Sequence, residues 1–192
     1  MTQLLTHYKF TVDEFDRMGE AGIFTKSDRV ELIEGEIVEM SPINDPHIFV
    51  VNLLNYLLNQ PLLQGRAFVQ VQSPIRLPPH SEPQPDIVVY RWREDLYRTS
   101  PPTNADILFV IEVADTTLAY DRQVKLPLYA AHGIPETWVV NIPGRAVIAG
   151  TDPAPDGYRH IRTVERRQSL SPQAFPDFSV VADELFPAFA ES

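Results

Sequence analysis

Apolar residues recur along the chain with two different spacings, which together predict a mixture of helices and strands. Helical spacing marks residues 45–60, where an apolar face recurs every three or four positions. Asp45 is predicted to cap this helix, and Pro46 suits its first position. A shorter helix is predicted to follow Thr11, because Thr11 and Glu14 form a T-x-x-E capping box.

Runs of aliphatic and β-branched residues between polar or proline-containing connections predict strands. Glu34 and Gly35 interrupt the run "RVELIEGEIVEM", which predicts a β-hairpin because glycine readily adopts the backbone conformation of a tight turn. Further strands are predicted in the segments "RAFVQVQSPIRL", "PDIVVYRW", "DILFVIEVA", "ETWVVNI", "AVIAG" and "YRHIRTV", the last as an edge strand.

A third helix is predicted in "AYDRQVKLPLYAAHG", between two of these strands. Gly133 is the expected stop after its last turn, whereas Pro127 predicts a kink or a break inside it. The strand–helix–strand unit over residues 106–142 favours an α/β (α+β) fold, in which helices flank a mixed central β-sheet. Residues 1–192 are predicted to form a single domain.

Composition narrows the class of protein. The 192 residues are 44% apolar and include no cysteine, which excludes disulfides and thiolate metal sites and favours a reducing cytoplasm. No apolar run approaches the roughly 20 residues that a membrane-spanning helix needs, and no signal peptide is evident. The formal net charge of −10 argues against a general nucleic-acid coat, but it leaves room for a local basic groove.

A carboxylate stands in the middle of the most apolar predicted strand. Glu112 follows "LFVI", and a lone buried carboxylate costs several kcal/mol or takes up a proton. Asp86 opens another predicted strand. If the two strands are neighbours, Asp86 and Glu112 converge at the sheet edge, and such a pair of oxygen ligands suits Mg²⁺ or Mn²⁺. Alternatively, Asp86 satisfies backbone N–H groups in a turn and Glu112 pairs with an arginine.

Lys125 lies in the helix that follows the Glu112 strand. Asp121, Lys125 and Tyr129 are spaced i, i+4, i+8 and form one polar stripe on an otherwise apolar helix. One interpretation is an exposed Asp121–Lys125 pair, worth about 0.3–0.5 kcal/mol. The other turns Lys125 towards the two carboxylates, where its charge would orient a water and stabilise negative charge on a phosphate.

The order of these motifs resembles the Uma2 family, whose members are small proteins usually labelled restriction endonucleases. The resemblance rests on "RVELIEGEIVEMSP", a histidine opening a helix, "PDIVVY", and "VIEVAD" followed by "DRQVKLPLYAAHGIPETWVV". This family belongs to the PD-(D/E)XK nuclease superfamily. The resemblance covers roughly residues 8–186 and implies a mixed sheet flanked by helices, with metal-dependent phosphodiester hydrolysis at one end.

The resemblance also implies roles for individual residues. Asp86 matches the aspartate of "PD" and Glu112 the acidic residue of the next strand. The superfamily lysine would stand at Ala114, and within the family its place is taken by Lys125 in the following helix. Asp115 departs from the serine that the family often has, and it adds a negative charge near the site.

The resulting hypothesis is an endonuclease that cleaves DNA. Asp86, Glu112 and the backbone carbonyl of Val113 are expected to hold Mg²⁺ or Mn²⁺, and Lys125 is expected to position a water. Because both strands of a duplex are cut most simply by a symmetric pair, a homodimer is expected. The alternative is an inactive nuclease fold that binds or regulates. A third reading, paired-carboxylate hydrolysis of a sugar, makes no use of Lys125.

Four residues are candidates for accessory roles, each with a simpler alternative. Glu34 could supply a ligand or only shape a turn. His47 could reach the site, although a lone histidine more often caps or packs. Gln70 and Gln72 share a strand face at i, i+2 and could point into the site, or they could be polar positions on a half-solvated strand.

Overall fold

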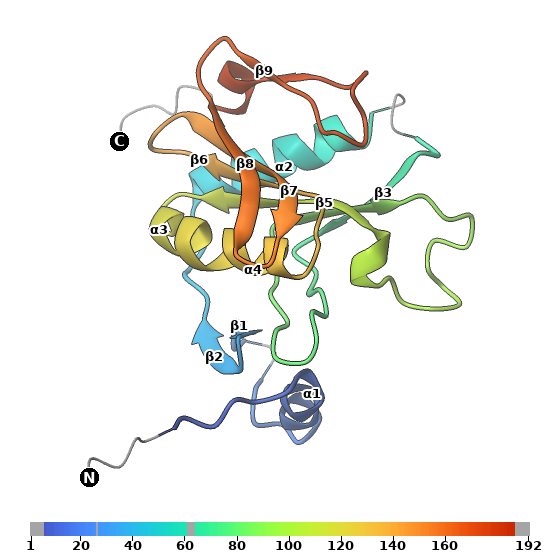
Figure 1. Ribbon diagram of the computed structural model, residues 1–192, viewed down its shortest axis with the longest axis vertical. Coiled ribbons are helices and arrows are strands. Elements are labelled where there is room, and N and C mark those ends of the chain that lie inside the picture. Colours follow the sequence, from blue (N-terminus) through green and yellow to red (C-terminus); the bar gives the residue numbers. More distant parts are fainter. Residues whose placement is uncertain (1–5, 26, 61–63, 187–192) are drawn as a thin grey trace. The chain divides into compact units, whose positions relative to one another are not determined.

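The computed structural model describes residues 6–25, 27–60 and 64–186, and the chain divides into two compact units (Figure 1). Unit 1 comprises Met1–Ser41 and Pro74–Gln84, and unit 2 comprises Pro42–Ser73 and Pro85–Ser192. The single domain over residues 1–192 stays a prediction. Within the described ranges no helix is long and apolar enough to cross a bilayer, and the cytoplasmic location stays a prediction.

Unit 1 contains the predicted short helix and hairpin. Helix α1 (Val12–Glu20) begins at the predicted capping box, in which the carboxylate of Glu14 also accepts a hydrogen bond from Tyr8. The hydrogen bonds from Tyr8 and Thr11 lower the pKa of Glu14 to about 2. Strands β1 (Val30–Ile33) and β2 (Glu36–Glu39) pair antiparallel around Glu34 and Gly35, which both have positive φ as a tight hairpin turn requires.

The described residues of unit 2 form a six-stranded sheet in the order β3-β4-β5-β6-β7-β8. Strands β5 and β6 are parallel, and the other neighbouring pairs are antiparallel. The predicted mixed sheet is therefore confirmed, with the "YRHIRTV" strand at its edge. The strands are β3 (Ala67–Val71), β4 (Ile87–Arg91), β5 (Ile107–Ala114), β6 (Glu136–Asn141), β7 (Ala146–Ala154) and β8 (Gly157–Val164).

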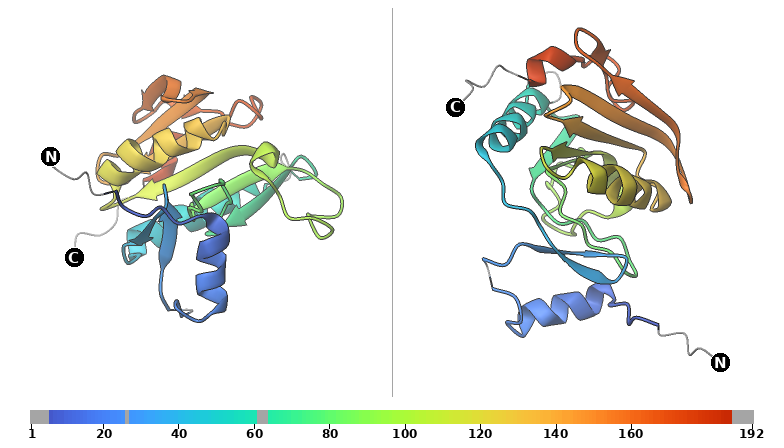
Figure 2. Two further views of the ribbon diagram at one scale, coloured as in Figure 1. Left: turned by 60° about the horizontal axis from the view of Figure 1, so that its bottom comes forward. Right: turned by 90° about the vertical axis from the view of Figure 1, so that its left-hand side faces the viewer.

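Helices cover both faces of this sheet, as Figures 1 and 2 show. Helix α2 (Asp45–Leu58) packs on one face, and a segmented helix packs on the other. The segments are α3 (Leu118–Tyr120), the π-helical turn η2 (Asp121–Lys125) and α4 (Leu126–Ala131). Short elements complete the described chain: η1 (Asn104–Asp106), β9 (Ser169–Leu170), β10 (Val180–Val181) and η3 (Ala182–Leu185).

The cap of α2 differs from the prediction. Asn44, not Asp45, is the N-cap, and its side chain accepts a hydrogen bond from the backbone N–H of His47. Asp45 is instead the first helical residue, where its negative charge is favourable to the helix dipole. The cap therefore fixes the backbone of His47 at the start of the helix.

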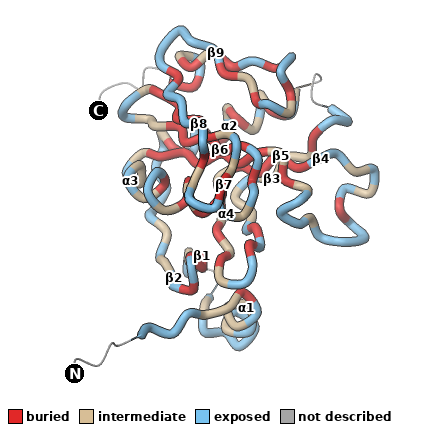
Figure 3. The backbone as a smooth tube through the Cα atoms, viewed as in Figure 1, coloured by how far each residue is buried: buried red, intermediate tan, exposed pale blue. Residues whose placement is uncertain are grey.

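Alternation along β5 assigns its side chains to two cores. Phe109, Ile111 and Val113 belong to the larger core beneath α2, whereas Ala114 belongs to the smaller core beneath α4. Since successive residues of a strand point to opposite faces, Glu112 points to the α4 face. Figure 3 shows the central strands as buried, so a carboxylate on either face of β5 needs a partner from a covering helix.

Pro127 explains why the third helix is segmented. The N–H of Leu126 bonds to the carbonyl of Asp121, five residues back, which makes one π-helical turn directly before the proline. Proline has no N–H to donate to the carbonyl four residues back. The helix is therefore wider where this hydrogen bond is missing. The predicted break is thus present as a π-helical turn, and the helix resumes as α4.

Gly133 ends α4 as predicted. It has φ +74°, its N–H bonds to the carbonyl of Ala130, and the N–H of Ile134 bonds to the carbonyl of Tyr129. These two bonds form the Schellman motif, in which a left-handed residue closes the last turn. The end of α4, and with it the backbone of Tyr129, is therefore held in place.

A pair of glycine variants tests this role. Gly133→Ala is expected to lower the free energy of unfolding by about 1 kcal/mol, because alanine is strained at positive φ. The control Gly19→Ala, in the helical part of α1, is expected to raise it by about 0.5 kcal/mol. An added Cβ meets no atom within 4 Å at either position. Urea denaturation of both variants checks the signs, and equal effects would contradict the assignment.

Candidate functional site

A buried carboxylate, ammonium and hydroxyl meet on the α4 face of the sheet. Glu112, Lys125 and Tyr129 are 3%, 4% and 0% exposed. The Nζ of Lys125 lies 3.2 Å from Oε1 of Glu112, and the hydroxyl of Tyr129 donates to the same oxygen at 2.5 Å. Lys125 and Tyr129 are one helical turn apart, so η2 and α4 bring both donors to one strand position.

The exposed Asp121–Lys125 pair is therefore wrong as an interpretation. Asp121 is also buried, and it accepts a hydrogen bond from the hydroxyl of Thr117 at 2.6 Å. Lys125 and Tyr129 of the polar stripe both contact the carboxylate of Glu112 on the sheet. Lys125 was predicted to turn towards both carboxylates, and its ammonium forms an ion pair with Glu112.

Asp86 lies at the end of the β4–β5 ladder. These strands are neighbours, which was the condition for the two carboxylates to converge, and Ile87 pairs with Ile111. Beyond that pair, the N–H of Val113 donates to Oδ2 of Asp86 at 2.9 Å. The side chain thus takes the place of a main-chain acceptor on the neighbouring strand, whereas the alternative interpretation had expected N–H groups of a local turn. Because this N–H belongs to the peptide bond after Glu112, the Asp86 carboxylate is one peptide unit from Glu112.

Two more side chains hold Asp86. Nε2 of His47 lies 3.1 Å from Oδ2, and Nε2 of Gln72 donates to Oδ1 at 3.3 Å. The other ring nitrogen of His47 is buried and has no hydrogen-bond partner among the described residues. Asp86 is therefore fixed by the start of α2, the end of β3 and the backbone of β5.

The two glutamines do not act alike. Gln70 lies inside the ladder opposite Val88, whereas Gln72 follows the last residue of β3 and has φ 48°. A residue in the left-handed region leaves the extended conformation, so the i, i+2 rule for a shared face does not apply to it. Of the two predicted glutamines, Gln72 contacts Asp86.

Glu34 and Asp115 lie in different units of the chain and form different hydrogen bonds. Glu34 is an exposed turn residue of unit 1, and its N–H donates to the hydroxyl of Ser81 at 2.9 Å. Its link to Asp86 and Glu112, which are in unit 2, stays a prediction. Asp115 accepts a hydrogen bond from the side-chain amide of Asn44, which joins the end of β5 to the cap of α2.

The donors at this end of the sheet agree in kind with a hard divalent ion. Asp86 and Glu112 offer carboxylate oxygens, and Mg²⁺ commonly binds one or two carboxylates and keeps several waters. Within the described ranges, no three side chains of His, Cys, Asp or Glu gather in a group that could hold a metal ion. A cation here would therefore depend on two carboxylates, main-chain oxygen and water.

Sequence reasoning gave no role to two groups. Tyr129 was part of the polar stripe, and its spacing from Lys125 was the signal that could have linked it to Glu112. The carboxylate of Glu136 accepts hydrogen bonds from the indole of Trp138 at 2.6 Å and from the N–H of Gln173 at 2.7 Å. Burial raises the pKa of Glu136 against the effect of these bonds. This buried carboxylate ties the 171–178 segment to the sheet.

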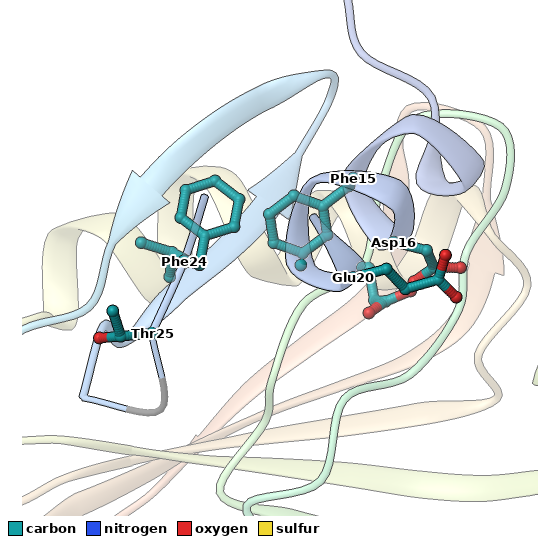
Figure 4. Close-up of a pocket in the computed structure, with 8 residues that line it drawn as sticks. Phe15, Asp16, Glu20, Phe24 and Thr25 are labelled. Carbon is teal, nitrogen blue, oxygen red and sulfur yellow. The ribbon is translucent and has the colours of Figure 1, made fainter. Parts of the chain in front are cut away.

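Unit 1 has a surface pocket of about 360 Å³ that contains none of the predicted site residues. Figure 4 shows Phe15 and Phe24 together, with Asp16 and Glu20 extending from α1. The two rings are 5.5 Å apart between centroids. Arg76 already forms an ion pair with Asp16, so part of the acidic charge of the pocket is balanced within unit 1.

Comparisons with known proteins show the family by a family model and the fold by a solved structure. The family model Uma2, described as "Putative restriction endonuclease", matches residues 12–184. The crystal structure of "a putative nuclease belonging to DUF820" from Anabaena variabilis is similar, with a TM-score of 0.72 and 18% identity. That similarity covers 92% of this chain and 97% of the other. No curated protein matches.

The buried ion pair predicts a specific stability pattern. Lys125→Met is expected to lower the free energy of unfolding by about 3 kcal/mol, because it leaves the Glu112 carboxylate buried without its ammonium. Lys125→Met/Glu112→Gln should recover most of this loss, since the neutral amide still accepts from Tyr129. Urea denaturation measures both. A double variant no more stable than Lys125→Met would show that the charge of Glu112 is not what Lys125 compensates.

Proposed function

Because this chain belongs to the Uma2 family, we propose that it is a metal-dependent endonuclease that hydrolyses phosphodiester bonds in DNA. The family description and the fold neighbour support a nuclease function. The observation that carries the finer proposal is the buried Lys125 ammonium against Glu112, one peptide unit from Asp86. A buried charge cluster of this kind is costly to fold, and such clusters concentrate at functional sites.

Asp86, Glu112 and the backbone carbonyl of Val113 are the groups that would hold Mg²⁺ or Mn²⁺. In an extended strand, the N–H and C=O of one residue point to the same side. The N–H of Val113 faces Asp86, so its carbonyl is on that side as well. When bound, the ion would supply a water of lowered pKa and neutralise phosphate charge.

The protein's own groups would orient the reaction. His47 and Gln72 hold the Asp86 carboxylate from two directions, which limits its rotation. Lys125 presents an ammonium with three donors in a buried setting, where it would stabilise the negative charge that develops on the phosphate. It would also orient the attacking water. The proposal also keeps the accessory roles predicted for Glu34 and Gln70.

A nuclease assay tests the assignment. Asp86→Ala and Glu112→Gln are expected to lower the rate of Mg²⁺- or Mn²⁺-dependent DNA cleavage at least about 100-fold, because each removes a carboxylate from the ion. The control is Asp152→Asn, which changes an exposed carboxylate on β7 and should leave the rate unchanged. Wild-type activity in Asp86→Ala would end the proposal.

The rival function is an inactive nuclease fold that binds or regulates, and the net charge of −10 and the additional carboxylate of Asp115 favour it. Calorimetric titration with Mg²⁺ separates the two. A nuclease site should release or absorb heat that disappears in Glu112→Gln. A fold without a working site should give no heat that depends on Glu112.

We also expect the active form to be a homodimer, because two identical sites related by symmetry can cut both strands of a duplex. Sedimentation velocity of the protein at micromolar concentration, with and without DNA, measures its mass. A monomer under both conditions would contradict this part of the proposal and leave the chemistry of a single site intact.

A further inference from the structure

Tyr129 is a buried group for which the proposed mechanism has no use. Its side chain is fully buried in α4, and its hydroxyl donates to Oε1 of Glu112 at 2.5 Å. Lys125 contacts the same oxygen at 3.2 Å. Two donors on one carboxylate oxygen are more than a single ion pair requires.

A second buried tyrosine shows what a purely structural hydroxyl does on this face. Tyr158 packs in the same small core beneath α4. Its hydroxyl donates to the carbonyl of Ile134 at 2.9 Å and lies 2.8 Å from the hydroxyl of Thr137. Neutral partners therefore satisfy Tyr158, whereas Tyr129 bonds to a charged acceptor, which gives a shorter and stronger hydrogen bond.

The hydroxyl of Tyr129 is well placed to set the orientation of Glu112. The terminal torsion of a glutamate side chain is broad, so backbone position alone does not fix its carboxylate. The Schellman motif at Gly133 closes the last turn of α4, where the N–H of Ile134 bonds to the carbonyl of Tyr129. Figure 2 shows α4 lying along the sheet that carries Glu112. The helix therefore presents a fixed donor to a side chain that would otherwise rotate.

We propose that Tyr129 is a positioning residue that holds Oε1 of Glu112 towards α4 and so fixes the orientation in which this carboxylate would meet the metal ion. This inference rests on the proposed function, since it concerns how Glu112 presents itself to the ion. Removing one outer partner of a metal ligand typically costs 10- to 100-fold in affinity.

The test compares two variants that each remove one buried hydroxyl. Mn²⁺ is titrated calorimetrically into the wild type, Tyr129→Phe and Tyr158→Phe. Tyr129→Phe is expected to weaken Mn²⁺ binding about 10- to 100-fold, and Tyr158→Phe should stay within about twofold of the wild type because its hydroxyl does not contact Glu112. In DNA cleavage, Tyr129→Phe should need more Mn²⁺ for its half-maximal rate, with KM for DNA unchanged at saturating Mn²⁺.

The possible outcomes distinguish this inference from the proposed function. Wild-type Mn²⁺ affinity in Tyr129→Phe, with binding that still depends on Glu112, overturns the positioning role alone. No Glu112-dependent binding and no cleavage in the wild type overturn both. Equal weakening in the two variants shows a general structural effect and also overturns the role. If Tyr129→Phe is partly unfolded, all three proteins are titrated in the presence of an osmolyte that stabilises the folded state. The folded fraction is then the same in the wild type and in both variants.

Discussion

The ion pair between Glu112 and Lys125 is the interaction on which the candidate site of unit 2 depends. Both groups are almost fully buried, and the transfer of two charges out of water costs more than most folds can offset with one contact. The cost is reduced because Tyr129 adds a third hydrogen-bonding group to the same carboxylate oxygen. Replacing a buried ion pair by well-packed hydrophobic residues of similar volume is often neutral or stabilising, so stability alone does not account for the pair, which agrees with the role proposed for it.

The surrounding backbone is adapted to this pair. β5 places Glu112 on the face opposite its larger core, and the π-helical turn before Pro127 leads into the helix that supplies both donors. At the same end of the sheet, the Asp86 side chain caps the open N–H of Val113. The irregular hydrogen bonding before Pro127 and the end of the β4–β5 ladder therefore both lie beside the charged residues. Departures from regular backbone structure are expected at functional sites.

Much of the architecture could be predicted from local patterns. The capping box at Thr11, the glycine turn at Gly35, the Schellman stop at Gly133 and the break at Pro127 each follow from the conformations that one residue type permits. The shift of the α2 cap to Asn44 shows the limit of this reasoning. Two adjacent residues were both good caps, and the choice depends on which side chain reaches the N–H of His47.

The sequence by itself determined the elements, their order and the suspicion that Glu112 needs a partner, because a carboxylate in an apolar strand is costly wherever that strand lies. The tertiary structure decided which residues are the partners of Glu112 and Asp86. Lys125, Tyr129 and His47 become neighbours of the two carboxylates through helix placement on opposite faces of the sheet. Gln72 itself has a left-handed backbone conformation, which the periodicity of a strand does not predict, and in this conformation its side chain contacts Asp86. Such contacts join residues far apart in the chain, and no local propensity encodes them.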